Sequence, residues 1–596
     1  MSATIEVNKQ SVEALLGSGK SKPFVIPEYQ RPYAWTDEQV ETLFEDLWEF
    51  TATSGGTERE SSYFLGSVVS YENEAGEQEI IDGQQRITSL FLLLRAIYTK
   101  LIATPISERT AEANNFIGKI EPTIWRTNKL TGTVDYKNIL LTSRVVNNEG
   151  NEILRSILES GDADAAAKDN YSKNYRYFQE LFNKHSTENP LMVYQFIYAL
   201  LNQAILLPIT ADTQDTALTI FSTLNDRGLP LSDADIFKAK IYNQLEVDDK
   251  KAFIERWKDL DEQANCVNES IQQLFYYNMF YYRALEKDTK TTTPGVRKYY
   301  AANKFERLYK PELLNTLFTI VNIWKVVNCG EDLENEVWSK NVKIKQTLDI
   351  LTSYPNEFWK YPVVIYYVCY RNEKDFEMKF ARFLNKLLME LMTKYLMIPT
   401  INAVKLDILK LNAAIVASDT PTFEFKTIDM NQLEAYIQNP NRNVVRMLLK
   451  TLAYEHQDEL LPAKWEIEHI FPQKWQANYF PEESYSIIKE KIEHIGNKLP
   501  FEKKLNITAG NGYFGKKKKE YTLSKIAITK ALGSDDINEW NMNSIMKRDI
   551  RVSDEVIKIL NRWNNEYLND TAEKIVEEPT AEDLARIEEF KKKGWI

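Results

Sequence analysis

The chain has few of the residues that build disulfide or cysteine–metal centres. Cysteine occurs only three times in 596 residues, at Cys266, Cys329 and Cys369. These positions form no CxxC pair that could hold zinc and no even set that could make a disulfide framework. Because free cysteine is among the most frequently buried residue types, we expect all three thiols to lie in the core.

Long hydrophobic runs are also lacking. The longest ones, at 90–94 and 361–370, fall well short of the roughly 18 to 20 apolar residues that span a bilayer. No positively charged, apolar signal precedes Ile5. Gly17–Ser21 is similar to the end of a phosphate-binding loop, but Ala14 stands where that pattern needs glycine. We therefore expect a cytoplasmic protein with no membrane partner, and a simple turn at Gly17–Ser21.

The overall composition is that of a globular protein with several domains. Hydrophobic residues make up 43% of the chain and charged residues 27%. A length of 596 residues exceeds what one hydrophobic core usually supports, so two to four domains are expected. The net charge of −12 argues against a protein that coats nucleic acid over its whole surface, although a local basic patch can still guide a polyanion.

One such basic patch lies near the C-terminus. Between Lys491 and Lys530, ten lysines stand against three acids. A lysine run is often just a solvated face. It can also neutralise phosphates. Because a histidine motif lies just upstream, we favour contact with DNA.

That histidine motif carries the clearest chemistry in the chain. Three of the four histidines, His456, His469 and His494, fall in one window. His469 stands in the segment EIEHIFPQ at 466–473, and two asparagines follow at Asn497 and Asn506. An acidic residue beside a histidine, followed by two spaced asparagines, is the residue set that a one-metal HNH nuclease needs.

Each residue of this set suits one part of phosphodiester hydrolysis. The unperturbed pKa of histidine, near 6.5, makes His469 the candidate base. Glu468 and Asn506 offer the hard oxygen ligands that Mg²⁺ or Mn²⁺ prefers. Asn497 would hold His469 or its loop. The alternative for His469 is a hydrogen-bonded core histidine, while His494 is expected to be structural.

A second group of polar residues is expected at turns in the N-terminal part. Tyr63–Tyr71 and Gln78–Ile81 predict a hairpin, and a helix follows with apolar residues at helical spacing from Ile87. The segment Asp82–Arg86 therefore lies on a strand-to-helix turn, where backbone N–H groups favour an anion. The segment 26–35, IPEYQRPYAW, offers a second turn with an arginine behind glutamine. A purely structural pairing of Asp and Arg between the two turns is the alternative.

Further elements are predicted by capping and periodicity. Thr36–Gln39 is a capping box that opens a helix through about Phe50. Segment 220–236 predicts helix, turn and helix, with Asn225, Asp226 and Gly228 in the turn and Ser232 capping the second helix with Asp235. From about 151 to 430 helical patterns dominate, the clearest at 380–395.

Taken together, these motifs resemble those of one family. The phrases IPEYQRPYAW, IIDGQQRITSL and IFSTLNDRGLPLSDADIFKAK are similar to the N-terminal module of GmrSD-type (Type IV) restriction endonucleases, whose fold is related to ParB and sulfiredoxin. The segment EIEHIFPQ…IGNKLP…KKLN…FGKKKKEY resembles the C-terminal HNH module of the family. The resemblance covers roughly residues 1–250 and 440–540. The step from Asn497 to Asn506 also resembles the HNH modules of RNA-guided nucleases, which commonly carry Asp where this chain has Glu468.

The resemblance implies functional residues in both modules. In the N-terminal module it implies a site for a nucleoside triphosphate, GTP or ATP, and the sensing of modified DNA such as phage DNA. In the C-terminal module it implies that a lysine contacts phosphate at position 516. The residues assigned to the nucleotide are Arg31, Asp82, Gly83, Gln84, Gln85 and Arg86. The residues assigned to DNA are Lys503, Lys504, Lys516, Lys517 and Lys518.

We therefore predict a largely helical α+β protein with three domains. Residues 1–250 would form a ParB/sulfiredoxin-like sensing and NTP-binding domain, 251–430 a helical connector, and 431–596 a ββα-metal HNH nuclease. The predicted function is nucleotide-regulated, metal-dependent cleavage of modified DNA in prokaryotic anti-phage defence, with regulation through domain movement or through oligomeric state, such as a homodimer. Two alternatives remain: a nucleotide-dependent DNA-binding regulator with an inactive HNH module, and a nuclease acting on RNA or host DNA.

Overall fold

The chain folds into two compact units, Met1–Asp259 and Leu260–Ile596, in a computed structural model. The structure describes residues 6–54, 61–128, 130–145, 148–224, 232–426, 429–475 and 485–575. The predicted domain border near 250 lies close to the division between the units, and the predicted border near 430 falls inside the second unit. The division into three domains stays a prediction.

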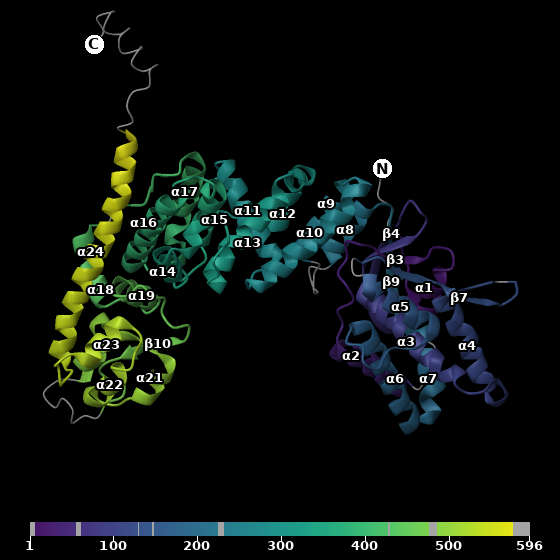
Figure 1. Ribbon diagram of the computed structural model, residues 1–596. Helices are drawn as coiled ribbons and strands as arrows, with labels where there is room; N and C mark the ends of the chain where they lie inside the picture. Colours follow the sequence, from purple (N-terminus) through teal and green to yellow (C-terminus); the bar gives the residue numbers. More distant parts are fainter. Residues whose placement is uncertain are drawn as a thin grey trace, which may run out of the picture. The chain divides into compact units, whose positions relative to one another are not determined.

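The first unit is built around a seven-stranded mixed sheet (Figure 1). Its order is β1-β9-β4-β5-β3-β8, and β2 also pairs with β9. The parallel pairs are β4 with β9, and β3 with both β5 and β8. The strands are β1 (Glu6–Val7), β2 (Gln10–Ser11), β3 (Phe24–Ile26), β4 (Tyr63–Glu72), β5 (Gln78–Asp82), β8 (Leu141–Ser143) and β9 (Ala204–Ala211). A separate two-stranded sheet joins β6 (Trp125–Thr127) and β7 (Val134–Ile139).

The predicted hairpin is confirmed as the antiparallel pair β4 and β5. Its turn closes because the side-chain oxygen of Asn73 accepts hydrogen bonds from the backbone N–H groups of Ala75 and Glu77, at 3.0 and 2.9 Å. Asparagine side chains commonly stabilise turns in this way. The hairpin ends at Asp82, directly before the polar turn.

Strand β9 was not predicted, although it lies next to β4 inside the sheet. Its sequence, AILLPITA, is a short and almost continuous apolar run. Such a run fits a buried strand and a buried helix equally well, so periodicity alone cannot separate the two. The prediction of a helix-dominated segment from about 151 missed this strand for that reason.

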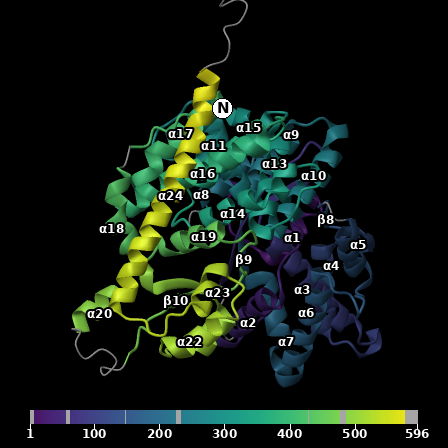
Figure 2. The ribbon, with the colours of Figure 1, turned by 60° about the vertical axis from the view of Figure 1, so that its left-hand side comes forward.

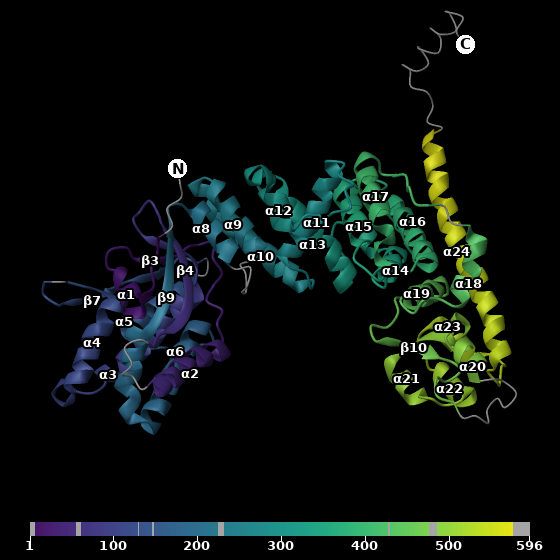
Figure 3. The same cartoon turned by 180° about the vertical axis from the view of Figure 1, so that it is seen from behind.

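Helices cover the sheet and contribute most of the first unit's core (Figure 3). α3 packs against α4 and α6, α2 packs against α6, and α1 contacts β9. Two predicted caps are confirmed: the Thr36 N–H donates to Gln39 Oε1 at 2.9 Å, and the Asp235 N–H donates to Ser232 Oγ at 3.2 Å. The helices are α1 (Val12–Ser18), α2 (Asp37–Ser54), α3 (Gln84–Ile102), α4 (Ala111–Ile124), α5 (Asn148–Ser160), α6 (Asn170–Glu188), α7 (Val193–Tyr198), α8 (Gln214–Leu224) and α9 (Asp233–Gln244), followed by α10 (Val247–Cys266), which crosses the division between the units.

The second unit begins with a helical array, as predicted for the middle of the chain. The predicted pattern at 380–395 is confirmed as part of α16, and its apolar residues are buried. The helices of this part are α11 (Ile271–Leu285), α12 (Val296–Ala301), α13 (Leu313–Cys329), α14 (Val342–Leu351), α15 (Lys360–Tyr370), α16 (Phe376–Met397), α17 (Lys405–Ala417), α18 (Leu433–Gln438) and α19 (Val445–Glu455).

The C-terminal part of the second unit contains a small antiparallel sheet and its surrounding helices. β10 (Trp465–His469) pairs with β11 (Lys498–Glu502), and α21 (Lys503–Ala509) follows at once. The remaining elements are α20 (Tyr485–Lys491), α22 (Phe514–Tyr521), α23 (Ala527–Ser534) and α24 (Met542–Ile575). α24 runs along this unit and contacts α16, α18 and α19 (Figure 2).

Strands and helices together confirm the predicted largely helical α+β class. Among the described residues no helix is both long enough and apolar enough to cross a membrane. The expectation that all three cysteines are buried was wrong: Cys266 and Cys329 are exposed, and Cys369 is partly exposed. Cys266 and Cys329 each end a helix, where the side chain faces away from the core.

Candidate active site

The C-terminal motif lies on two paired strands and the helix that follows them. Glu468 and His469 end β10, and His469 lies opposite Lys498 at the start of β11. Asn497 directly precedes β11. Asn506 lies in α21, which packs against both strands. The order strand, strand, helix therefore brings the four motif positions into one small substructure.

The surroundings of His469 favour its neutral form. Its side chain is 16% exposed, and burial lowers the pKa of the imidazole below the usual value near 6.5. Glu493, whose Oε1 lies 3.5 Å from His469 Nε2, opposes this shift, whereas the ammonium groups of Lys498 and Lys517 add to it. A histidine with a lowered pKa is unprotonated at neutral pH and can accept a proton.

Glu468 is almost fully buried and is already paired. Its Oε1 accepts a hydrogen bond from the Tyr521 hydroxyl at 2.6 Å and lies 2.8 Å from Lys517 Nζ. Burial lowers the pKa of the Lys517 ammonium, while the carboxylate of Glu468 opposes the shift. Lys517 also donates to the backbone carbonyl of His469 at 2.5 Å. One lysine therefore compensates the charge of Glu468 and fixes the end of β10.

This arrangement corrects the prediction that Lys517 contacts DNA. The Lys517 side chain is 2% exposed, because α22 turns it inward together with Phe514 and Tyr521. A buried lysine engaged by a carboxylate cannot meet a DNA phosphate at the surface. The other lysines assigned to DNA remain accessible: Lys503, Lys504 and Lys516 are exposed, and Lys518 is partly exposed.

Asn497 is fully buried and uses its side chain to hold the loop after His469. Its Oδ1 accepts from the Phe471 N–H at 2.7 Å and from Trp540 Nε1 at 3.2 Å. Its Nδ2 donates to the carbonyls of Phe471 and Ile492, both at 3.0 Å. This geometry matches the loop-holding function expected for Asn497, and it leaves the amide engaged on both sides.

Asn506 differs from Asn497 in the hydrogen bonding of its side chain. Its side chain is partly exposed and, within the part of the chain that the structure describes, makes no hydrogen bond. No group of three or more His, Cys, Asp or Glu side chains is placed to hold a metal among the described residues. One carboxylate and one amide oxygen still fit the preference of Mg²⁺ or Mn²⁺ for hard oxygen ligands, with water for the rest. An ion bound by Glu468 would share that carboxylate with Lys517.

The N-terminal motif lies between β5 and α3, as predicted. Gly83 is the residue before the helix and has a φ of 89°, a left-handed conformation that favours glycine. A Cβ atom here would lie 3.1 Å from the Ser67 carbonyl, so the backbone passes unusually close to β4. Gly83 provides no side-chain cap for α3. The first backbone N–H groups of a helix have no partner within the helix itself.

Gln84 and Gln85 bind the segment 26–35 to this turn. Gln84 Nε2 donates to Gln30 Oε1 at 3.0 Å. Gln85 Oε1 accepts from the Ala34 N–H at 2.7 Å, and its Nε2 donates to the Pro32 carbonyl at 3.1 Å. The two polar segments, 26–35 and 82–86, therefore pack against each other, and the side-chain amides of both glutamines form hydrogen bonds within the chain.

The charged residues of this turn gather around Asp82. Burial raises the pKa of Asp82, while the Gly83 N–H and the positive charges of Arg86 and Arg31 act against the shift. Arg86 donates from Nη1 to the Ser67 carbonyl at 3.0 Å, and Arg31 is exposed. Asp82 thus lies within the electrostatic influence of two arginines, although among the described residues it forms no direct ion pair with either. Arg31 still presents its guanidinium to solvent.

The predicted turn at Asn225, Asp226 and Gly228 lies outside the described residues.

Several residues that shape the sites were not singled out in the sequence, namely Glu493, Lys498 and Tyr521. A signal for Tyr521 existed: Phe514, Lys517 and Tyr521 are spaced as one helical face, which predicts burial of all three.

Comparison with known proteins agrees with this two-part organisation. Residues 12–242 match the N-terminal domain of the GmrSD restriction endonuclease, and residues 424–552 match the C-terminal domain of the GmrSD restriction endonucleases. No curated protein matches the chain. Both matched domains come from one class of enzyme, the restriction endonucleases, and together they cover more than half of the chain. Within this class, the chain belongs to the GmrSD family.

Proposed function

We propose that the β10–β11–α21 substructure is an HNH-type centre that hydrolyses phosphodiester bonds in DNA. The observation that carries the proposal is the placement of Glu468 and His469 at the end of one strand, with Asn506 in the helix after its partner strand. It is supported by the family to which the chain belongs, which consists of restriction endonucleases. Exposed lysines at 503, 504 and 516 provide the positive charge that DNA phosphates require.

His469 acts as the general base in this proposal. The neutral imidazole takes a proton from a water molecule as the water oxygen attacks phosphorus, and the bond to the leaving oxygen breaks. Asn497 keeps the loop after His469 fixed through its two bonds to Phe471. A bound Mg²⁺ or Mn²⁺ would supply charge stabilisation for the phosphorane and the leaving oxygen. Glu468 and Asn506 would hold that ion.

The N-terminal turn is proposed to bind the phosphates of GTP or ATP. Arg31 is exposed beside Asp82, and the uncapped N–H groups at the start of α3 suit an anion. Gly83 allows close approach of the backbone. Gln84 and Gln85 serve as framework, because their amides hold segment 26–35. Nucleotide binding would then control cleavage of modified phage DNA.

A cleavage assay tests the nuclease proposal. Plasmid and modified phage DNA are incubated with the protein, with Mg²⁺ or Mn²⁺, and with or without GTP and ATP. We expect metal-dependent cleavage by the native protein and a loss of about 10²- to 10⁴-fold in His469→Ala, the usual contribution of general base catalysis. The matched control is His456→Ala, which removes an exposed histidine paired with Glu555.

Two results would contradict the proposal. Equal activity of the native protein and His469→Ala would show that another residue or a contaminant cuts. Intact DNA with every metal and nucleotide would favour a binding protein with an inactive centre. An RNA substrate in parallel tests the alternative of an RNA-directed nuclease.

Nucleotide binding is tested separately by titration calorimetry with GTP and ATP. We expect Arg31→Ala to weaken binding at least about tenfold, since charge-assisted hydrogen bonds to phosphate are strong. Arg155→Ala is the control, because Arg155 is exposed and pairs with Glu159 on α5. Unchanged affinity in Arg31→Ala would place the nucleotide elsewhere.

A further inference from the structure

Helix α24 forms hydrogen bonds with the turn at residues 494–498, which contains Asn497. Asp549, on the N-terminal half of α24, accepts a hydrogen bond from the Gly496 N–H at 2.7 Å through Oδ1. Its Oδ2 lies 2.8 Å from His494 Nδ1. Asp549, His494 and Asn497 are all buried, with exposed fractions of 2%, 6% and 0%. Buried, charge-assisted hydrogen bonds of this kind fix geometry strongly.

The neighbouring residue on α24 binds the same turn from its carbonyl side. Nη1 of Arg548 donates to the carbonyls of Ile495, Gly496 and Lys498 at 3.1, 2.8 and 2.9 Å. Burial lowers the pKa of Arg548 to about 10, so the guanidinium stays charged at neutral pH. Arg548 and Asp549 therefore hold both the N–H and the C=O groups of one turn.

Gly496 makes this close approach possible. A Cβ atom at position 496 would lie 2.3 Å from the Ile545 carbonyl and 2.7 Å from Asp549 Oδ1. Those distances are far shorter than any van der Waals contact, so a larger residue would push α24 away from the turn. The glycine between His494 and Asn497 is thus required by the packing of α24.

From this turn the chain of contacts continues to the catalytic histidine. The Asn497 carbonyl accepts from the Ile470 N–H at 2.9 Å, and the Asn497 side chain binds the Phe471 N–H at 2.7 Å. Ile470 and Phe471 directly follow His469 in the chain. A shift of the turn would therefore move the backbone to which His469 is attached.

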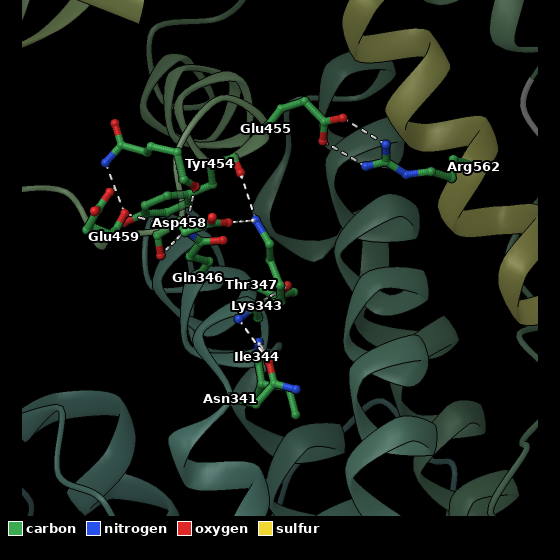
Figure 4. A network of polar contacts seen from close by, with 11 residues as sticks. Asn341, Lys343, Ile344, Gln346, Thr347, Tyr454, Glu455, Asp458, Glu459 and Arg562 are labelled. Atoms are coloured by element: carbon green, nitrogen blue, oxygen red, sulfur yellow. Dashed lines mark hydrogen bonds and ion pairs between the residues drawn. The ribbon is translucent and has the colours of Figure 1, made fainter. Parts of the chain in front are cut away.

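The C-terminal half of α24 is bonded to the helical array of the same unit. Arg562 forms two hydrogen bonds of 2.8 Å with Glu455 at the end of α19 (Figure 4). Lys386 on α16 donates to Asn564 Oδ1 at 2.6 Å, and the Tyr567 hydroxyl donates to the Pro421 carbonyl at 2.6 Å. The family's C-terminal domain matches residues 424–552. Of these three contacts, the second and third join residues that both lie outside this segment, and in the first only Arg562 lies outside it.

The segment that leads from α19 into β10 is held by the same array. Gln346 on α14 donates from Nε2 to the carbonyls of Gln457 and Asp458, both at 3.0 Å. Lys343 Nζ lies 3.0 Å from Asp458 Oδ1 (Figure 4). The helical array thus contacts the nuclease substructure at several places. α19 packs against β11, and both α18 and α24 contact the turn at Asn497.

We propose that Asp549 on α24 is a positioning residue for His469. The proposal deepens the proposed function, because it takes His469 as the general base. Asp549 acts through the turn, Asn497 and Phe471, without touching substrate. A shift of α24 would move His469 relative to the scissile phosphate, and small misplacements of catalytic groups reduce rates strongly.

The experiment compares Asp549→Asn with Asp554→Asn, an exposed aspartate on the same helix. The asparagine oxygen can still accept from Gly496, but its amide group can no longer accept the His494 Nδ1–H. The asparagine amide could bond to His494 only in the other tautomer, which would bury an N–H group at Nε2, where no hydrogen-bond partner lies among the described residues. The amide hydrogens of Ile470 and Phe471 then become less protected.

Hydrogen exchange followed by mass spectrometry reads this effect without any cleavage. We expect exchange in peptides containing Ile470 and Phe471 to speed up roughly tenfold to a hundredfold in Asp549→Asn. We expect no change in Asp554→Asn. In a cleavage assay Asp549→Asn should lower kcat about tenfold or more and leave KM for DNA within about twofold. A change in KM alone would contradict a positioning function.

Two further variants keep the test decisive. His494→Asn, made in the native background, retains a side-chain N–H donor for Asp549 and should leave hydrogen exchange and kcat close to native values. Arg548→Lys keeps the charge but reaches fewer carbonyls, so it should speed up exchange at Ile470 and Phe471 even if Asp549→Asn fails to fold. Unchanged exchange in Arg548→Lys or in a folded Asp549→Asn would overturn the proposal. If the native protein cuts no DNA, the proposed function is wrong. The exchange data still show whether Asp549 holds the backbone at Ile470 and Phe471, next to His469.

Discussion

The N-terminal turn at Asp82–Arg86 and the C-terminal substructure at Glu468–Asn506 use the same residue types in opposite ways. Both carry an acid at or near the end of a strand, and each motif includes two amide side chains, Gln84 and Gln85 in the first and Asn497 and Asn506 in the second. In the N-terminal turn both amides, Gln84 and Gln85, bind the chain itself. In the C-terminal substructure Asn497 does so, whereas Asn506 stays uncommitted.

The two acids also differ in their partners. Asp82 lies near Arg86 and the exposed Arg31, so positive charge at this turn reaches the surface. Glu468 meets Lys517, which is buried with it. The comparison teaches that the amide side chains bonded within the chain, at Gln84, Gln85 and Asn497, build the two sites, whereas Asn506 and Arg31 stay accessible to a ligand. It also predicts that the C-terminal acid contributes far more to folding.

The largest expected effect concerns the buried pair of Glu468 and Lys517. Lys517→Met should lower the free energy of unfolding of the second unit by about 3–5 kcal/mol, because it leaves a buried carboxylate without its counter-charge. Urea unfolding followed by circular dichroism measures this difference. The neighbouring variant Lys516→Met, at an exposed position, should change stability by less than about 0.5 kcal/mol. Equal effects of the two variants would contradict the burial of Lys517 and restore it as a surface residue.

A smaller effect is expected at the glycine of the N-terminal turn. Gly83→Ala should destabilise the first unit by about 1–2 kcal/mol, because alanine is strained at a φ of 89° and its Cβ would approach β4 closely. Gly118→Ala is the matched control, since Gly118 lies within α4 with open space around it. Alanine there should stabilise the helix by up to about 1 kcal/mol. Destabilisation of equal size in both variants, measured by thermal unfolding, would argue against the special backbone at Gly83.

Local sequence signals predicted a good part of this molecule. The hairpin before Asp82, the caps at Thr36 and Ser232 and the helix at 380–395 all follow from turn chemistry, capping and periodicity, and each is present. These features depend on residues close together in sequence. A ββα arrangement of the C-terminal motif was implied only by the resemblance to HNH modules, and the motif residues lie at two strands and a helix.

What the sequence left open depends on distant partners. β9 needed its neighbour β4 to be recognised as a strand. The burial of Lys517 depends on Glu468, which lies far away in sequence. The hold of Asp549 on Gly496 joins residues more than fifty positions apart. A lysine in a lysine run resembles a surface residue until its acidic partner is known, and the helical spacing of Phe514, Lys517 and Tyr521 was the one local hint.

The most direct test of the central claim compares the two asparagines in one experiment. Asn497→Ala and Asn506→Ala are each examined for thermal unfolding and for metal-dependent DNA cleavage. We predict that Asn506→Ala unfolds at the native temperature but loses activity about a hundredfold or more, as expected for a lost metal ligand. Asn497→Ala should unfold at a clearly lower temperature, because it removes four buried hydrogen bonds. The reverse pattern, a stable Asn497→Ala and an unstable but active Asn506→Ala, would contradict the account.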